Sequence, residues 1–242
     1  MGFVVFKGYG ETHTAPVGTL QEELPIGNPV FADNDWETII EACQNDRVPT
    51  TWGIGDQKTV TIDGADYAID IIGKNHDEYS DGSGKAPLTF QMHGYYAYTK
   101  AMNSSATNNG GWDSSYMRKT TLPALLKTMP TEVKSALKHV NKPTSSGNKS
   151  TTIKVSEDGL FLLSEVEVFG TNTLSATGEG SQYEYYAAGN SAKKAEGSVV
   201  SSWWLRSPVT SSSADFCAVN SNGALVSHSA SASQCFAFAF CF

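Results

Sequence analysis

The last eight residues of the chain alternate strictly between phenylalanine and a smaller residue, from Cys235 to Phe242. Successive side chains of a β-strand point to opposite faces. The run therefore predicts a strand with four phenylalanines on one face and alanines and cysteines on the other. A chain that closes in this way belongs among folds that contain a β-sheet.

The segment that includes this ending carries almost no charge. The whole chain of 242 residues has 17 Lys+Arg and 25 Asp+Glu, yet Asp215 is the one charged residue from Ser207 to the end. Ser207 to Gln234 is rich in serine and alanine. Small polar side chains lose little rotamer entropy when they are ordered and can donate or accept hydrogen bonds. This composition is typical of an adaptable binding surface, although a serine-rich surface that only keeps strand turns soluble has the same composition.

Composition excludes several classes of protein. A hydrophobic fraction of 40% with 11% aromatic residues excludes a wholly disordered chain. A net charge of -8 and the lack of clustered cations argue against nucleic-acid binding. The longest apolar run, Cys235 to Phe242, is too short to span a membrane, and we expect no membrane insertion. No signal peptide is legible at the start of the chain.

Short elements of both kinds predict an α+β fold with a few helices and short, mostly antiparallel strands. We expect an N-terminal arm or docking segment over residues 1–30 and one domain over 31–242. A helix is expected at 33–43, capped by Asp33 or Asn34, and a hairpin around the Asp63-Gly64 turn. Further helices are predicted at 115–129, interrupted near Pro123, and at 131–139. The other predicted strands are 88–92, 150–155, 159–163, 202–207, 216–219, 224–227 and 235–242, with a loop-rich insert at 170–197.

Catalytic motifs are nearly absent from the sequence. His76-Asp77 could form a catalytic or metal-binding pair, but a solvated loop in which both side chains hold local turns is the simpler interpretation. The stretch from Asp77 to Gly82 lacks the ligand spacing of a calcium loop. The four cysteines form no Cys-x-x-Cys pair, and we expect buried thiols in a reducing compartment. We therefore predict no enzyme, no metal and no cofactor.

One block near the C-terminus, Trp203-Trp-Leu-Arg-Ser-Pro208, is the most specific motif of the chain. Weaker motifs precede it in a fixed order. They are Gly55-Asp56, Ile71 to Asp77, Leu88-Thr-Phe90, Asn109-Gly-Gly-Trp112 with Met117-Arg118, Leu160 to Ser164, Glu167 to Gly170 and Glu179 to Tyr183. With these motifs the chain, from about Trp52 to its end, resembles the C-type-lectin-fold variable proteins of diversity-generating retroelements, which occur in phages and bacteria.

The resemblance implies a function and a location. In such families a reverse-transcribed template, mutated at adenines, overwrites the 3′ end of the gene, so Asn codons diversify without reaching Lys, Glu, Gln, Met or Trp. Residues 207–242 contain no Lys, Glu, Met or Trp and a single Gln, at Gln234. The implied protein is a hypervariable ligand- or receptor-binding protein with its variable region at about 203–242. Its partner would be a protein or other receptor on a target cell, and its location a virion (phage tail) or a bacterial surface, where it would act as an adhesin.

Carried over position by position, the resemblance separates a constant scaffold from a variable set. The scaffold positions are Trp203, Trp204, Leu205, Arg206, Pro208, Phe216, Cys217, Val219, Gly223, Ala230 and Phe240. The ligand-binding positions are Val209, Ser211, Ser212, Ala214, Asp215, Ala218, Asn220, Ser221, Asn222, Ala224, Val226, Ser227, His228, Ser229, Ala232, Ser233 and Gln234. The resemblance implies that these side chains share one exposed face. The N-terminal arm would contact a virion or a second copy of the chain.

The chain departs from the family at its end. Relatives close with Gly-Val-Arg-Pro-Ala-Phe, whereas this chain has Cys235 to Phe240 there. The sugar-binding calcium motifs of true C-type lectins are also missing, which argues against calcium-dependent sugar binding. Two alternatives stay open. One is a relative of formylglycine-generating oxidases that would hold copper through Cys235 and Cys241, although an extended strand places these about 20 Å apart. The other is a purely structural tail component.

Overall fold

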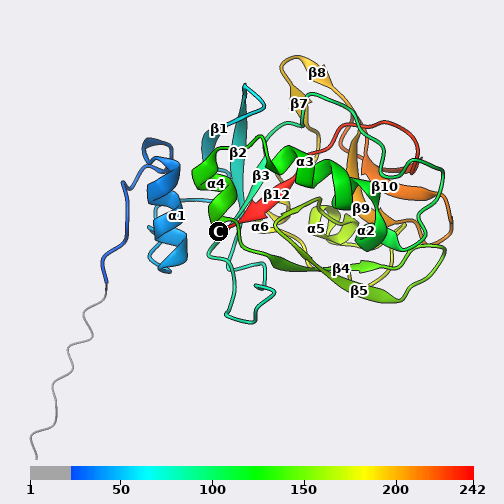
Figure 1. The fold of residues 1–242 in the computed structure, drawn as a ribbon, viewed down its shortest axis with the longest axis horizontal. Helices are drawn as coiled ribbons and strands as arrows, with labels where there is room; N and C mark the ends of the chain where they lie inside the picture. The colour runs from blue at the N-terminus through cyan, green and yellow to red at the C-terminus, as the bar shows by residue number, and fades with distance from the viewer. Residues whose placement is uncertain (1–22) are drawn as a thin grey trace, which may run out of the picture.

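The computed structural model describes residues 23–242. The body is elongated, with helix α1 (Trp36–Gln44) at one end and strands β9 to β11 at the other (Figure 1). The predicted arm, residues 1–30, lies outside the described residues up to position 22. Residues 23–30 form an irregular, mostly exposed segment beside α1.

The first helices hold this end of the chain on the sheet. A 3-10 turn, η1 (Phe31–Asp33), leads into α1. The helix is capped by Asp35, whose carboxylate accepts a hydrogen bond of 2.8 Å from the Thr38 amide. The expected caps were therefore wrong: Asp33 belongs to η1, and the Asn34 amide instead donates to carbonyls of the preceding loop. Trp36 packs α1 against Phe90, with ring centroids 5.9 Å apart.

A five-stranded sheet forms the centre of the molecule, in the order β1-β2-β3-β12-β6. Its strands are β1 (Gln57–Ile62), β2 (Ala65–Lys74), β3 (Leu88–Met92), β6 (Leu160–Phe161) and β12 (Ala239–Cys241). The predicted hairpin is confirmed, because Ile62 pairs with Ala65 across the turn. Asp63 and Gly64 both have positive φ, at 52° and 77°, as a tight two-residue hairpin turn requires.

The C-terminal ending differs from the prediction. Only Ala239–Cys241 forms a strand, and β12 lies between β3 and β6. Both of its faces are buried, since a central strand is covered on both sides. Phe240 stacks on Phe90 at 5.4 Å on one face, while Cys241 Sγ lies 3.5 Å from the Thr89 hydroxyl on the other. The alternation of residue types therefore reflects two different buried environments.

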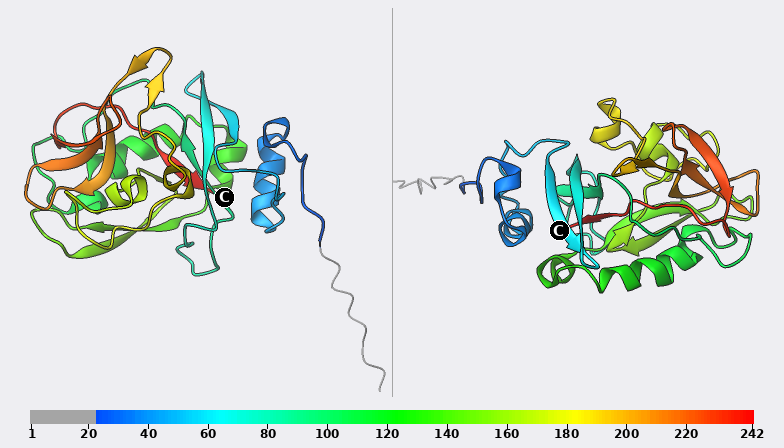
Figure 2. Two further views of the ribbon diagram at one scale, coloured as in Figure 1. Left: turned by 180° about the vertical axis from the view of Figure 1, so that it is seen from behind. Right: turned by 90° about the horizontal axis from the view of Figure 1, so that it is seen from above.

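Three helices lie in a row along one side of the molecule (Figure 2). They are α2 (Gly111–Ser114), α3 (Leu122–Leu126) and α4 (Thr131–Ala136), and a π-helical turn η2 (Met117–Thr121) precedes α3. The predicted 115–129 helix is thus a π turn followed by an α turn. Pro123 lies just after their junction, where its missing N–H is tolerated.

Polar strands and short helices fill the next part of the chain. They are β4 (Val140–Ser145), β5 (Ile153–Asp158), α5 (Glu165–Phe169), α6 (Glu184–Ala187), β7 (Ala195–Glu196) and β8 (Val199–Val200). The sequence did not indicate β4, because Lys142 and Pro143 interrupt its apolar pattern. It also missed α5, whose capping box pairs Ser164 with Glu167.

A second sheet of three strands occupies the end of the molecule opposite α1. Its order is β11-β10-β9, from β9 (Trp203–Pro208), β10 (Asp215–Val219) and β11 (Leu225–Ser229). These strands were predicted, with shifted ends. The α+β class with small antiparallel sheets is confirmed. Within residues 23–242, no helix has the length and apolar character needed to cross a bilayer.

Candidate functional site

The predicted ligand-binding positions gather on the β9–β11 sheet and its loops. Fifteen of the seventeen have exposed or half-buried side chains. The other two are buried: Val209 is 4% exposed and Ala218 is 0% exposed. The structure therefore corrects the expectation for these two positions, whose side chains face the interior and not a ligand. We call the remaining fifteen positions the candidate surface.

The predicted scaffold positions show the opposite burial. Ten of the eleven are buried, and the exception is Gly223. Gly223 has φ of +84°, and a Cβ there would lie 3.2 Å from the Lys193 amide nitrogen. A glycine is therefore required by the backbone of this turn and not by burial.

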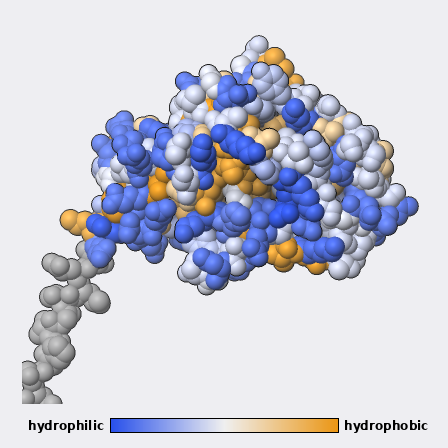
Figure 3. Space-filling model, viewed as in Figure 1, coloured by the Kyte–Doolittle hydropathy of each residue, from blue (hydrophilic) through white to orange (hydrophobic). Residues whose placement is uncertain are grey.

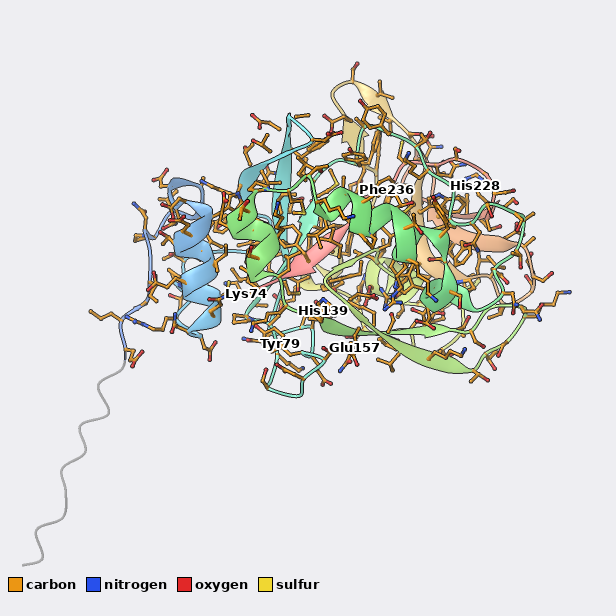
Figure 4. The ribbon with its side chains drawn as sticks, in the orientation of Figure 1. Lys74, Tyr79, His139, Glu157, His228 and Phe236 are labelled. Atoms are coloured by element: carbon orange, nitrogen blue, oxygen red, sulfur yellow. The ribbon has the colours of Figure 1, made fainter. Side chains whose placement is uncertain are left out.

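The candidate surface is not a single sheet face. Antiparallel partners share a face, and successive residues of one strand alternate. Ser227 and Ser229 lie on one face of β11, whereas Val226 and His228 lie on the other. His228 packs edge-to-face on Trp204 at 6.0 Å, at the end of the molecule shown in Figure 4. The expectation of one face is thus corrected: the surface wraps around the edge strand β11.

The loop before β10 is held through its main chain. Asn108, which is fully buried, donates from its side-chain amide to the carbonyls of Ser212 (2.9 Å) and Asp215 (2.8 Å). Its backbone N–H donates to the Ser213 carbonyl at 2.8 Å. None of these three bonds uses a side-chain atom of the loop. The side chains of the loop can therefore change without loss of the bonds that fix its path.

The turn between β10 and β11 is held differently. The Asn220 side-chain oxygen accepts hydrogen bonds from the amides of Asn222 (2.9 Å) and Ala224 (3.0 Å). Asn220 thus builds the turn that presents its neighbours. Ser221, Asn222 and Ala224 are exposed around it. Among the predicted contact residues, Asn220 therefore has a structural role that the sequence did not indicate.

A second anchor reaches the start of the variable segment from α5. The buried Glu165 carboxylate accepts hydrogen bonds from three successive amides, those of Thr173, Leu174 and Ser175. The Leu174 carbonyl in turn accepts from the backbone N–H (2.9 Å) and the hydroxyl (3.0 Å) of Thr210. The carboxylate fixes one loop, and that loop fixes the next.

Buried charges lie beneath β9. Arg206 is 0% exposed and pairs with both oxygens of Glu167, one of them at 2.9 Å. The Lys142 ammonium donates to Glu167 (3.2 Å), to the Tyr183 hydroxyl (2.8 Å) and to Asp77. An ammonium has three donors, and all three are used. This network is saturated and leaves no free donor for a ligand.

The charge state of the network follows from its pairing. Burial favours the neutral acid, but the Arg206 guanidinium and the Lys142 ammonium outweigh it and lower the pKa of Glu167. Lys142 likewise lowers the pKa of Asp77 against the effect of burial. Glu179 has no such direct cation on its carboxylate, which accepts from Ser145 N (2.9 Å) and from the Ser207 hydroxyl. Burial therefore raises the pKa of Glu179 to about 7.

The His76-Asp77 pair belongs to this network and not to a solvated loop. Asp77 is 4% exposed, and the His76 ring stacks on Tyr183 at 4.0 Å. The simpler interpretation from the sequence was therefore wrong about Asp77. Burial also lowers the pKa of His76.

The cysteines lie apart. All four are free and buried, as predicted. Cys235 borders Trp203 of β9, whereas Cys241 lies in β12 beside Thr89. Within residues 23–242, no three His, Cys, Asp or Glu side chains are grouped to hold a metal ion.

The residues that anchor the candidate surface were missed by sequence reasoning. Asn108, Glu165 and Glu179 come from separate loops and helices, and nothing local distinguishes them. The one readable signal was Ser164-x-x-Glu167, a capping-box spacing before an apolar stretch.

The visible face of the molecule agrees with this division. In Figure 3 the main apolar area lies near the middle, beside α3 and α4, while the end with β9 to β11 is mostly pale or blue.

Comparison with known proteins yields one match. A family model described as Domain of unknown function (DUF6273) matches residues 89–237, more than half of the chain. The match begins in β3 and includes the whole candidate surface. No curated protein and no solved structure matches the chain.

Proposed function

The chain belongs to the DUF6273 family, and we propose that it is a hypervariable binding protein that displays the candidate surface on a C-type lectin scaffold. It is proposed to be the variable protein of a diversity-generating retroelement. Its partner is a receptor on a target cell, and the protein acts in a phage tail or as an adhesin on a bacterial surface. The proposal assigns no catalytic step to the chain.

The main-chain anchoring of the 209–215 loop is the observation that carries the proposal. A surface that changes its side chains must keep its backbone in place by contacts that do not involve those side chains. Asn108 supplies such contacts to Ser212, Ser213 and Asp215. A scaffold of this kind separates folding from recognition.

The division of burial supports the same function. The scaffold positions of β9 and β10 are buried on both faces, so the hydrophobic effect fixes them independently of the surface. The exposed positions are mostly Ser, Asn and Ala, which contribute little to the core. Substitutions at exposed positions usually change stability by less than about 0.5 kcal/mol.

The dimensions of the surface suit a macromolecular partner. β11 has five residues, so the 209–215 loop and the 220–224 turn lie about 17 Å apart at 3.4 Å per residue. A patch of that length with both loops approaches the roughly 800 Å² that each partner buries in a standard protein–protein interface. Its position opposite α1 leaves the other end of the molecule free for attachment (Figure 1).

A pair of displayed libraries tests the proposal. One library randomises six exposed positions of the candidate surface: Ser211, Ser221, Asn222, Ala224, Ser227 and Ser233. The matched library randomises six exposed positions elsewhere: Thr61, Ser83, Thr151, Ser181, Glu184 and Glu132. Both are selected against the same folded probe protein, hen egg lysozyme.

We expect binders at least ten times more often from the first library than from the second, with both libraries folded at similar yield. Equal yields of binders would show that the candidate surface has no special capacity. A first library that fails to fold would refute the separation of scaffold and surface.

A further inference from the structure

A recess of about 510 Å³ lies away from the candidate surface, between β2, the residue that follows β3, and the β7–β8 hairpin. Its volume falls in the usual range of small-molecule sites. The side chains that line it include Asp66, Tyr67, His93, Tyr185, Lys193 and Glu196. The proposed binding function uses none of them.

A glycine allows the recess to form. A Cβ added at Gly94 would lie 2.3 Å from the Ala195 carbonyl oxygen and 3.0 Å from Oε2 of Glu196. The β7–β8 hairpin therefore approaches the chain closely here, and the Glu196 carboxylate lies beside the residue that follows His93.

A buried carboxylate orients the imidazole of His93. Asp70 is 1% exposed, and its Oδ2 lies 2.8 Å from Nδ1 of His93, whose side chain is 52% exposed. The Gln57 side-chain amide donates to the other oxygen of Asp70 at 2.8 Å. A carboxylate only accepts, so Nδ1 carries the hydrogen. The lone pair of Nε2 is then directed away from Asp70, and Nε2 is available as an acceptor.

The charges around the recess select the kind of ligand. Asp66 and Glu196 line it and Asp70 lies beneath it, against one lining cation, Lys193. The neighbouring Lys194 is buried and donates to the carbonyls of Met92 and His93. This excess of carboxylates repels anions and attracts cations. The rings of Tyr67 and Tyr185 provide aromatic surfaces, to which organic cations bind favourably.

We propose that this recess binds a small organic cation with an ammonium or guanidinium group. One N–H of the ligand donates to Nε2 of His93, and its charge is balanced by Glu196. Neutral ligands of the same shape obtain only the hydrogen bond, and anions are repelled. The inference is independent of the receptor-binding proposal, because the two surfaces share no residue.

Titration of the chain by NMR with four probes of one size tests this proposal. The probes are n-butylammonium, n-butylguanidinium, 1-butanol and butanoate, added at constant ionic strength and at pH 8.5. We expect saturable shifts of the His93 ring and Tyr185 resonances with the two cations only. Equal shifts with 1-butanol, or no saturable shift with either cation, would overturn the proposal.

Variants locate the site. Glu196→Gln and His93→Gln should each weaken n-butylguanidinium binding at least tenfold, while Glu132→Gln, an exposed residue on α4, should not. His93 and Glu196 are partly or fully exposed, so these variants should keep the melting temperature within a few degrees. Unchanged affinity in a folded Glu196→Gln variant would contradict the placement of the charge.

Discussion

Arg206 and Glu167 form a two-point ion pair that is shielded from solvent directly beneath the strand that leads into the candidate surface. Both side chains are at most 2% exposed, and Glu167 also accepts from Lys142 and from the Ser164 amide. The arginine of the Trp-Trp-Leu-Arg-Ser-Pro block thus fixes the base of β9 and cannot contact a ligand.

Removing one partner of this pair should unfold the base of β9. Glu167→Gln leaves Arg206 and Lys142 as buried cations with one carboxylate fewer, and we expect a loss of about 3–5 kcal/mol in the free energy of unfolding. Urea denaturation measures it, with Glu184→Gln, an exposed residue on α6, as the control. A loss below about 1 kcal/mol would show that the network does not support the fold.

Asn108 should be essential for the 209–215 loop. Asn108→Ala removes two side-chain bonds to carbonyls of this loop, and each net hydrogen bond contributes about 0.5–1.5 kcal/mol. We expect a loss of about 1–3 kcal/mol and faster hydrogen exchange at residues 209–215. Asn109→Ala, next to it and exposed, is the control. Equal exchange rates in both variants would contradict the assigned role of Asn108.

Glu179 should make the protein less stable as pH rises toward neutrality. Its pKa is about 7 when folded and 4.5 ordinarily, so the folded state holds a proton that the unfolded state has lost between these values. Stability therefore falls as pH rises from about 4.5 through 7. Asp77 and Glu167, whose pKa values are lowered, act in the opposite sense and only below their ordinary range.

Glu179→Gln should flatten this decline between pH 5 and 7. His93, whose pKa is raised mainly by its bond to Asp70, adds a decline centred at higher pH that the variant retains. Melting temperatures across the range measure both. A wild-type stability that rises from pH 5 to 7 would contradict the assignment.

Two positions of the predicted variable set should respond in opposite ways to the same substitution. Ser227→Asn on exposed β11 should change the free energy of unfolding by less than about 0.5 kcal/mol. Ala218→Asn places an amide where no space or partner is available, and should cost more than about 2 kcal/mol. Equal tolerance at both positions would mean that the face of β10 beneath the loops is not packed as described.

Much of the fold was predictable where local signals are strong. The Asp63-Gly64 turn identified the β1–β2 hairpin, and the Trp203 block identified β9. Strand β4 could not be predicted, because Lys142 is buried only through Asp77 and Glu167, which are distant in sequence. Such pairings arise from tertiary structure, and no local pattern indicates them.

The candidate surface was predictable in outline through the resemblance, but its anchors were not. Alternation along β11 places His228 against Trp204, away from Ser227, and this depends on which faces of the sheet are covered. Asn108 is separated from the loop it holds by about a hundred residues, so only the folded chain shows its role.

The DNA around the gene tests the central claim most directly. The account predicts a nearby near-copy of the segment that encodes residues 203–242, next to a reverse transcriptase gene. The two copies should differ almost only at adenines of the template, in codons of the exposed positions such as Ser211, Ser221 and Ser227. Differences spread over all four bases, or concentrated in codons of buried positions such as Trp204 and Phe216, would contradict the account.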